Sequence, residues 1–154
     1  IIDIKEDGTF HLNMDYFDYC TGMKMTNDKF NSLFGGPPRK PEQDLTQHHM
    51  DLASSIQKLT EEIVLKLSKS IAIETGEKNL CLAGGVALNC VANGVLQKEK
   101  IFENIWVQPA AGDAGGALGA ALAYWHKELK EPRNNFTDQM KGSFLGPKFK
   151  DEDI

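Results

Sequence analysis

Two glycine-rich turns constrain the fold of this chain more than any other feature of its sequence. The first occupies Leu82–Asn89 and the second Gly112–Leu122, and each follows a short apolar segment and precedes a helical pattern. A repeated order of strand, turn and helix is typical of an α/β fold with parallel strands and right-handed crossovers. Ligands of such folds bind beyond the carboxyl ends of the strands, where backbone N–H groups can hold phosphate. Both turns are expected at such ends.

The first turn contains the adjacent glycines Gly84 and Gly85. Adjacent glycines allow positive φ and let the backbone approach a ligand closely, but they serve equally well in a tight strand-to-helix turn. The turn matches neither the dinucleotide fingerprint nor the P-loop pattern. Asn89 is expected one turn into the helix that follows, where it faces either a nucleotide or solvent.

The second turn places Asp113 at the start of a helix that contains several glycines. One interpretation makes Asp113 an N-cap that accepts from the N–H groups of Gly115 or Gly116, which is worth about 1 kcal/mol. The other makes it a metal ligand, because a carboxylate oxygen suits magnesium, manganese or ferrous iron. Each glycine inside a helix costs about 1 kcal/mol, so this run has a packing or a ligand-binding reason.

Composition describes one globular domain: the chain has 154 residues, of which 41% are hydrophobic and 25% charged. No apolar run reaches the roughly 20 residues of a membrane span, and no leader resembles a signal peptide, so we expect a cytoplasmic protein without a membrane partner. A net charge of −5 argues against a nucleic-acid partner.

The cysteines and histidines show no catalytic or metal-binding spacing. Cys20, Cys81 and Cys90 are expected to be buried small hydrophobic residues rather than disulfide or zinc ligands. Solvated or capping roles are expected for the histidines, which are His11, His48, His49 and His126.

The pattern along the chain predicts an N-terminal β-hairpin, one long helix, and then alternating strands and helices. The hairpin covers 1–19, a short helix 26–34, and the long helix 44–75, with a capping box of Asp44 and Gln47. Its apolar stripe comprises Leu52, Ile56, Leu59, Ile63, Leu67 and Ile71. Strands are expected at 80–83 and 105–107, and helices at 86–98 and 114–129. Because the chain begins at Ile1 inside a strand, we expect a fragment of a longer polypeptide.

The two turns and the segment between them resemble the carbamoyltransferases of the nodulation-protein and antibiotic-tailoring family. The matching stretches are Leu80–Gly94 (LCLAGGVALNCVANG) and Ile105–Leu122 (IWVQPAAGDAGGALGAAL). Asp51–Gln57 and Leu145–Pro147, which an acidic cluster follows, are similar too. Two long motifs in the family's order are far more specific than either glycine pair.

The resemblance implies an actin-like ATPase fold, similar to tRNA threonylcarbamoyl transferases and sugar kinases, with a mixed sheet packed by helices. It implies that 1–133 is the C-terminal portion of the first domain and that 134–154 is a linker toward a second domain. In the family, carbamoyl phosphate and ATP supply a carbamoyl-adenylate, and the carbamoyl group moves to a hydroxyl of a sugar or antibiotic-like acceptor.

Carried over residue by residue, the resemblance implies a nucleotide site and a metal ligand. The nucleotide-binding residues would be Gly84, Gly85, Val86, Asn89, Gly112, Gly115 and Gly116. Asp113 would hold the divalent metal, which is iron, magnesium or manganese. The family's paired metal-binding histidines and its second domain are absent from this sequence, so we expect the isolated chain to lack carbamoyl transfer activity.

Two other functions remain open from the sequence. One is a sugar-kinase-like phosphotransferase, in which Asp113 would act as a base rather than as a metal ligand. The other is a non-catalytic half-domain that only packs against its partner half.

Overall fold

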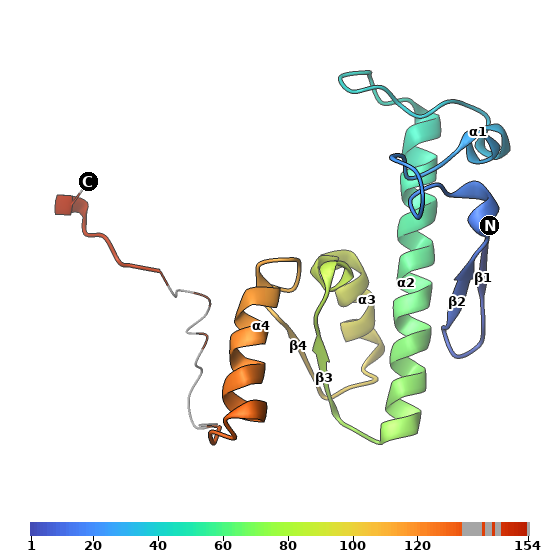
Figure 1. Cartoon of the computed structure of the whole chain (residues 1–154). Helices are drawn as coiled ribbons and strands as arrows, with labels where there is room; N and C mark the ends of the chain where they lie inside the picture. The colour runs from blue at the N-terminus through green and yellow to red at the C-terminus, as the bar shows by residue number, and fades with distance from the viewer. Residues whose placement is uncertain (134–139, 141–142, 144–145, 154) are drawn as a thin grey trace. The chain divides into compact units, whose positions relative to one another are not determined.

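The computed structural model in Figure 1 describes residues 1–133, 140, 143 and 146–153. Most of the expected linker, 134–154, lies outside the described residues. The chain divides into two compact units. The first unit comprises Ile1–Leu80 and Asn89–Ile105, and the second comprises Cys81–Leu88 and Trp106–Ile154. Both helices and strands are present, as the α/β prediction requires.

The first unit begins with the predicted hairpin. Strands β1 (Ile2–Ile4) and β2 (Phe10–Leu12) pair antiparallel, with Ile2 opposite Leu12. Gly8 turns the chain with φ +85°, and a Cβ at this position would collide with the backbone of Leu67. Only glycine therefore allows the hairpin turn to lie this close to the long helix. The strand alternation does not continue to Met14, which begins a 3₁₀ turn, η1 (Met14–Tyr16).

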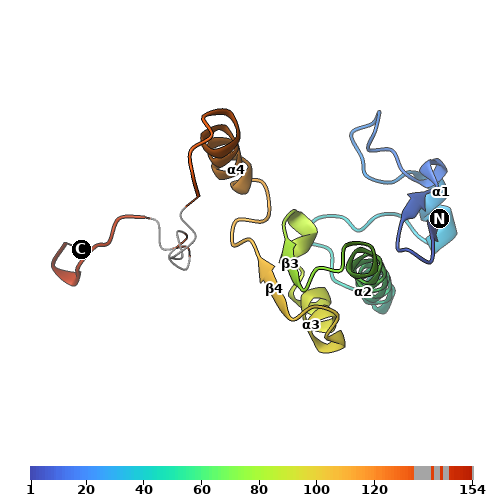
Figure 2. The ribbon, with the colours of Figure 1, turned by 90° about the horizontal axis from the view of Figure 1, so that it is seen from below.

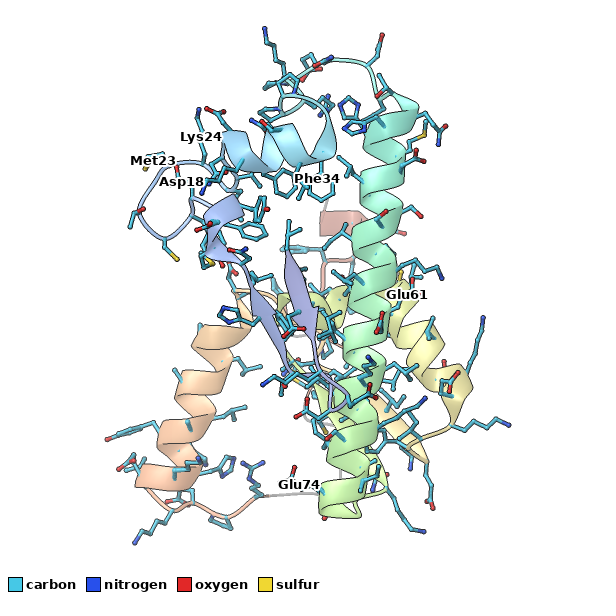
Figure 3. All side chains as sticks on the ribbon, turned by 90° about the vertical axis from the view of Figure 1, so that its right-hand side faces the viewer. Asp18, Met23, Lys24, Phe34, Glu61 and Glu74 are labelled. Atoms are coloured by element: carbon cyan, nitrogen blue, oxygen red, sulfur yellow. The ribbon has the colours of Figure 1, made fainter. Side chains whose placement is uncertain are left out.

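Helix α1 (Asp28–Phe34) confirms the predicted short helix and its cap. The Asn27 side chain accepts from the N–H groups of Lys29 and Phe30 at 3.0 and 3.3 Å. Gly35 ends the helix in the left-handed conformation, with φ 81°. Figure 3 shows Phe34 at the end of α1.

Helix α2 (Gln47–Thr75) confirms the predicted long helix but not its capping box. The helix begins after Thr46, whose N–H donates to His49 Nδ1 at 3.0 Å, so Asp44 lies outside the helix. The capping role expected for a histidine is thus filled by His49. The apolar stripe is only partly covered, because Ile56 and Ile71 are exposed.

Helix α3 (Cys90–Glu99) lies alongside α2, as Figures 1 and 2 show from two directions. Asn89 hydrogen-bonds to Gln57 at one end, and Lys69 pairs with Glu99 at 3.6 Å near the other. The two helices therefore run in the same direction. On α3, Ala92 and Leu96 are 2% and 1% exposed and form the centre of this unit's core.

Strands β3 (Asn79–Leu82) and β4 (Asn104–Val107) form the predicted pair. The Lys78 carbonyl accepts from Glu103 N, and the Leu82 carbonyl accepts from Gln108 N. Because the partners advance together along both segments, the strands are parallel. In the described part of the chain this pair and the hairpin form two separate sheets, so the expected single mixed sheet is not present.

The second unit contains the last two residues of each of these strands and the loops that follow them. Helix α4 (Gly115–Ala123) follows the second glycine turn and continues into a single π-helical turn, η3 (Tyr124–Glu128). These elements confirm the helix predicted at 114–129. A short 3₁₀ turn, η5 (Asp151–Asp153), lies near the C-terminus.

The prediction of buried cysteines was wrong, because Cys20, Cys81 and Cys90 are all exposed thiols. Cys81 alternates along β3 with the half-buried Leu80 and Leu82 and therefore lies on the opposite, uncovered face. Within the described ranges, no helix combines the length and apolar character needed to cross a bilayer.

Replacing Leu96 with alanine should destabilise the chain by about 2–5 kcal/mol, because the fully buried side chain leaves a cavity in the core. Urea unfolding followed by circular dichroism measures this change. Val91→Ala on the same helix is the control, since Val91 is 52% exposed and its truncation should cost less than about 0.5 kcal/mol. Equal losses in the two variants would contradict this description of the core.

Candidate functional site

The two glycine turns lie side by side in the second unit. Gly84 N donates to the Ala111 carbonyl at 2.9 Å, and Leu88 Cδ1 lies 3.5 Å from the Cβ position of Gly112. The hydrogen bond from Gln108 N to Leu82 O immediately precedes this contact and aligns the two loops. The structure thus brings together the turns that the sequence places at the carboxyl ends of two parallel strands.

The first turn does not open directly into an α-helix, which corrects the predicted helix 86–98. Gly84 has φ +107°, a conformation that favours glycine, and the next residues form a 3₁₀ turn, η2 (Gly85–Leu88). Its first hydrogen bond runs from Ala87 N to Gly84 O at 3.0 Å. The N–H groups of Gly85 and Val86 precede that bond and have no partner within the 3₁₀ turn.

The second turn places Asp113 two residues before α4, and its carboxylate does not cap the helix. The residue at the N-cap is Ala114, and no side chain caps α4. Instead, the backbone carbonyl of Asp113 accepts from Gly116 N at 3.0 Å. The capping interpretation of the Asp113 side chain was therefore wrong. This side chain is exposed, and no ion pair or side-chain hydrogen bond joins it to another described residue.

The glycines of the two turns divide into those that pack closely and those that leave an open face. A Cβ on Gly115 would collide with the Ala110 carbonyl oxygen, so Gly115 is needed for a close backbone approach. By contrast, a Cβ on Gly84, Gly85 or Gly116 would meet no described atom within 4 Å. Packing explains Gly115 and the positive φ explains Gly84, whereas neither explains Gly85 or Gly116.

The described residues do not by themselves assemble a metal centre. Nowhere in the ranges that the structure describes do three or more histidine, cysteine, aspartate or glutamate side chains form a group that could hold a metal. Asp113 supplies one exposed carboxylate, and one carboxylate cannot complete a coordination shell.

Asn89 belongs to the first unit and has a different position from the one expected. It is the N-cap of α3 rather than a residue one turn inside a helix. Its Oδ1 accepts from Ala92 N at 3.0 Å, which is the usual capping bond. The helix therefore begins at Cys90, because the Asn89 side chain stabilises its first turn.

A network of polar side chains from α2 reaches Asn89, and the sequence did not predict it. Gln57 exchanges two hydrogen bonds with Asn89, at 2.8 and 3.2 Å, and also donates to Glu61 Oε1 at 3.0 Å. Lys58 pairs with Glu61 Oε2 at 3.2 Å. The i, i+4 spacing of Gln57 and Glu61 beside the apolar stripe is the sequence signal that could have identified this pair.

Hydrogen bonds from Gln57 and then from Lys58 lower the pKa of Glu61, which Figure 3 labels on α2. A carboxyl whose pKa is lower in the folded state stabilises the fold above its unfolded pKa. This stabilisation is lost when the pH falls through the folded pKa. At neutral pH Glu61 is therefore a carboxylate and can only accept hydrogen bonds.

An apolar cavity of about 790 Å³ in the first unit is a less suitable site for chemistry. It lies between the hairpin, α1 and α2, and no carboxylate, imidazole or side-chain cation lines it. Its lining residues are Ile1, Ile2, Leu12, Phe17, Tyr19, Met25, Thr26, Phe30, Phe34, Leu52, Ala53, Ser55, Ile56 and Leu59. The glycine turns provide the polar groups that this cavity lacks.

Known proteins similar to this chain are longer than it is. It is 59% identical over its whole length to the protein sll1178 of Synechocystis, of which it covers 25%. Over 70% of its length it is 51% identical to the nodulation protein NolNO of Sinorhizobium fredii and 44% identical to NolO of Bradyrhizobium diazoefficiens. The chain covers 16% and 20% of these two proteins, respectively.

A family model described as the carbamoyltransferase N-terminus matches residues 1–122. The match includes both glycine turns, the Asn89 cap and the start of α4, which are the segments that carry the resemblance seen in the sequence. The chain therefore belongs to the carbamoyltransferase family, within the part that forms its N-terminal region.

Proposed function

We propose that this chain is the nucleotide- and metal-binding portion of an O-carbamoyltransferase with an actin-like ATPase fold. In this proposal carbamoyl phosphate, water and ATP give a carbamoyl-adenylate, phosphate and pyrophosphate. The carbamoyl group then passes to the hydroxyl oxygen of a sugar or antibiotic-like acceptor, and AMP leaves. The observation that carries the proposal is the hydrogen bond from Gly84 N to Ala111 O, which joins the two turns of the family motif.

The joined turns offer the groups that bind phosphate. The N–H groups of Gly85 and Val86 precede the first bond of η2, and the N-terminus of α4 begins at Gly115. Backbone N–H groups at a helix start favour an anion, since the helix dipole is positive there. The open faces of Gly84, Gly85 and Gly116 let a phosphate approach without a Cβ in its way.

Asp113 is the residue that would hold a divalent metal beside these phosphates. Its carboxylate is exposed and has no hydrogen bond to other described residues, so it can coordinate without breaking a protein contact. A metal bound here would neutralise charge on phosphate oxygens. Asp113 would be one ligand of several, and the remaining ligands would come from other parts of the full-length protein.

The apolar character of α4 supports a role within a larger domain. Its sequence, GGALGAALA, is apolar on all sides, yet none of its residues is buried in this chain. A helix that is apolar all round is normally covered by other parts of its protein. Because the chain covers a quarter or less of the relatives described above, the rest of the polypeptide would provide that cover and the second catalytic domain.

Alanine at Gly115 and at Gly116 should have opposite effects. Gly115→Ala should lower the thermal stability of the protein, because its Cβ collides with the Ala110 carbonyl. Gly116→Ala should keep or raise stability, since alanine favours the helix by about 1 kcal/mol, but should weaken nucleotide binding by covering the open face. Thermal unfolding and calorimetric titration with a non-hydrolysable ATP analogue separate the effects. Unchanged affinity in Gly116→Ala would count against a phosphate site at this turn.

Asp113→Asn in the full-length protein should weaken metal binding by about tenfold or more, because a neutral amide is a poorer ligand than a carboxylate. Manganese titration followed by electron paramagnetic resonance measures the affinity. Asp151→Asn, which alters another exposed carboxylate of the second unit, is the control. Loss of turnover with unchanged metal affinity would favour the phosphotransferase alternative, in which Asp113 acts as a base.

The isolated chain should show no carbamoyl transfer, because among the described residues Asp113 has no companion ligands to complete a metal shell. The chain also covers a quarter or less of the relatives described above. A turnover assay with carbamoyl phosphate, ATP, a divalent metal and a hydroxyl acceptor measures this. Metal-dependent product from the isolated chain would contradict the prediction.

A further inference from the structure

The amide groups of Gln57 and Asn89 form a reciprocal pair between α2 and α3. Asn89 Nδ2 donates to Gln57 Oε1 at 2.8 Å, and Gln57 Nε2 donates to Asn89 Oδ1 at 3.2 Å. Both residues are partly buried and both lie in the first unit. Two bonds between the same two planar groups hold the Asn89 amide in one orientation.

The direction of each hydrogen bond is fixed at both ends of the network. At one end the Glu61 carboxylate can only accept, so the Gln57 atom next to it is the nitrogen. At the other end the Ala92 N–H can only donate, so the Asn89 atom facing it is the oxygen. Both ends require the same orientation of the two amides. Exchanging oxygen and nitrogen in either amide would place two donors or two acceptors next to each other.

This arrangement uses the whole acceptor capacity of Asn89. Its Oδ1 has two lone pairs, and it accepts one hydrogen from Gln57 and one from Ala92. Its Nδ2 has two hydrogens, and one of them is donated to Gln57. The second hydrogen has no acceptor among the residues that the structure describes. Any further hydrogen bond of this amide must therefore be a donated one.

We infer that Gln57 is a positioning residue that orients the Asn89 amide, so that Asn89 recognises a hydrogen-bond acceptor of the nucleotide and never a donor. Suitable acceptors are an unprotonated ring nitrogen or a sugar oxygen. This inference rests on the proposed function and on the nucleotide contact that the family resemblance implies for Asn89. Gln57 itself does not touch the nucleotide in this account and acts only through Asn89.

Asn89→Asp tests the donated hydrogen bond. Aspartate is as good an N-cap as asparagine, so α3 keeps its start, but an ionised carboxylate has no hydrogen to donate. Calorimetric titration of the full-length protein with a non-hydrolysable ATP analogue should show an affinity about tenfold lower or worse. The melting temperature should fall, because the new carboxylate oxygen faces Gln57 Oε1 and both atoms are acceptors. The titration is therefore done well below the melting temperature of the variant.

Gln57→Met tests the positioning role, because methionine has a similar length and helix propensity but cannot form the paired hydrogen bonds. In this variant the Asn89 amide is free to rotate, and nucleotide binding must order it again. The affinity for the nucleotide should therefore fall by roughly three- to tenfold. Gln47→Met is the matched control. Gln47 also donates to a carboxylate four residues later on α2, Asp51 Oδ1 at 2.7 Å, but it has no bond to α3.

The double variant separates positioning from a general structural effect. Because Gln57 acts through Asn89, adding Gln57→Met to Asn89→Asp should cause no further loss of affinity. A purely structural role would lower affinity by the same factor in both backgrounds. If Gln57→Met does not fold, Glu61→Gln serves as the second variant. Its amide can donate as well as accept, so it no longer determines which atom of the Gln57 amide faces Asn89. It should weaken binding only while Asn89 is present.

The outcomes distinguish this inference from the proposed function. No saturable binding of the ATP analogue by the wild type would overturn both. Wild-type binding with unchanged affinity in Asn89→Asp, or additive losses in the double variant, would overturn the inference and leave the proposed function standing. A loss in each single variant, none in Gln47→Met and no further loss in the double variant would support it.

Discussion

The packing of α3 along α2 is the interaction on which the first unit depends. Ala92 and Leu96 lie four residues apart on α3, so they share one face and are buried together. The amide pair of Gln57 and Asn89 fixes one end of this contact, and the ion pair of Lys69 and Glu99 lies near the other. The ion pair is exposed and adds little stability. Apolar burial supplies the stabilisation, and the amide pair determines which residues lie opposite one another.

Local signals in the sequence predicted much of this fold. The Asn27 cap and the Gly35 stop act within a few residues of one another, so α1 could be placed without knowledge of the rest of the chain. The start of α3 was placed too early because Val86–Leu88 continues an apolar pattern that suits a helix equally well. What ends the 3₁₀ turn and begins the helix is the Asn89 side chain, whose orientation a residue pattern does not reveal.

The candidate site was predictable in position but not in detail. Both glycine turns were expected at strand ends, but no pattern in the sequence distinguishes Gly115 from Gly116. Their difference arises from the Ala110 carbonyl, which reaches one glycine and not the other. The partner of Asn89 is 32 residues away in the sequence, and only the packing of α2 against α3 brings Gln57 to it. Contacts of this kind depend on tertiary structure, so spacing along the chain does not predict them.

The hydrogen bond between Gly84 and Ala111 also has a mechanical consequence. It joins the loop after β3 to the loop after β4, so neither loop can move away from the other while the bond is intact. The two loops are therefore expected to move together. A ligand that displaces one loop therefore also displaces the other, and the two loops separate only when this hydrogen bond breaks and the Leu88 side chain moves away from Gly112.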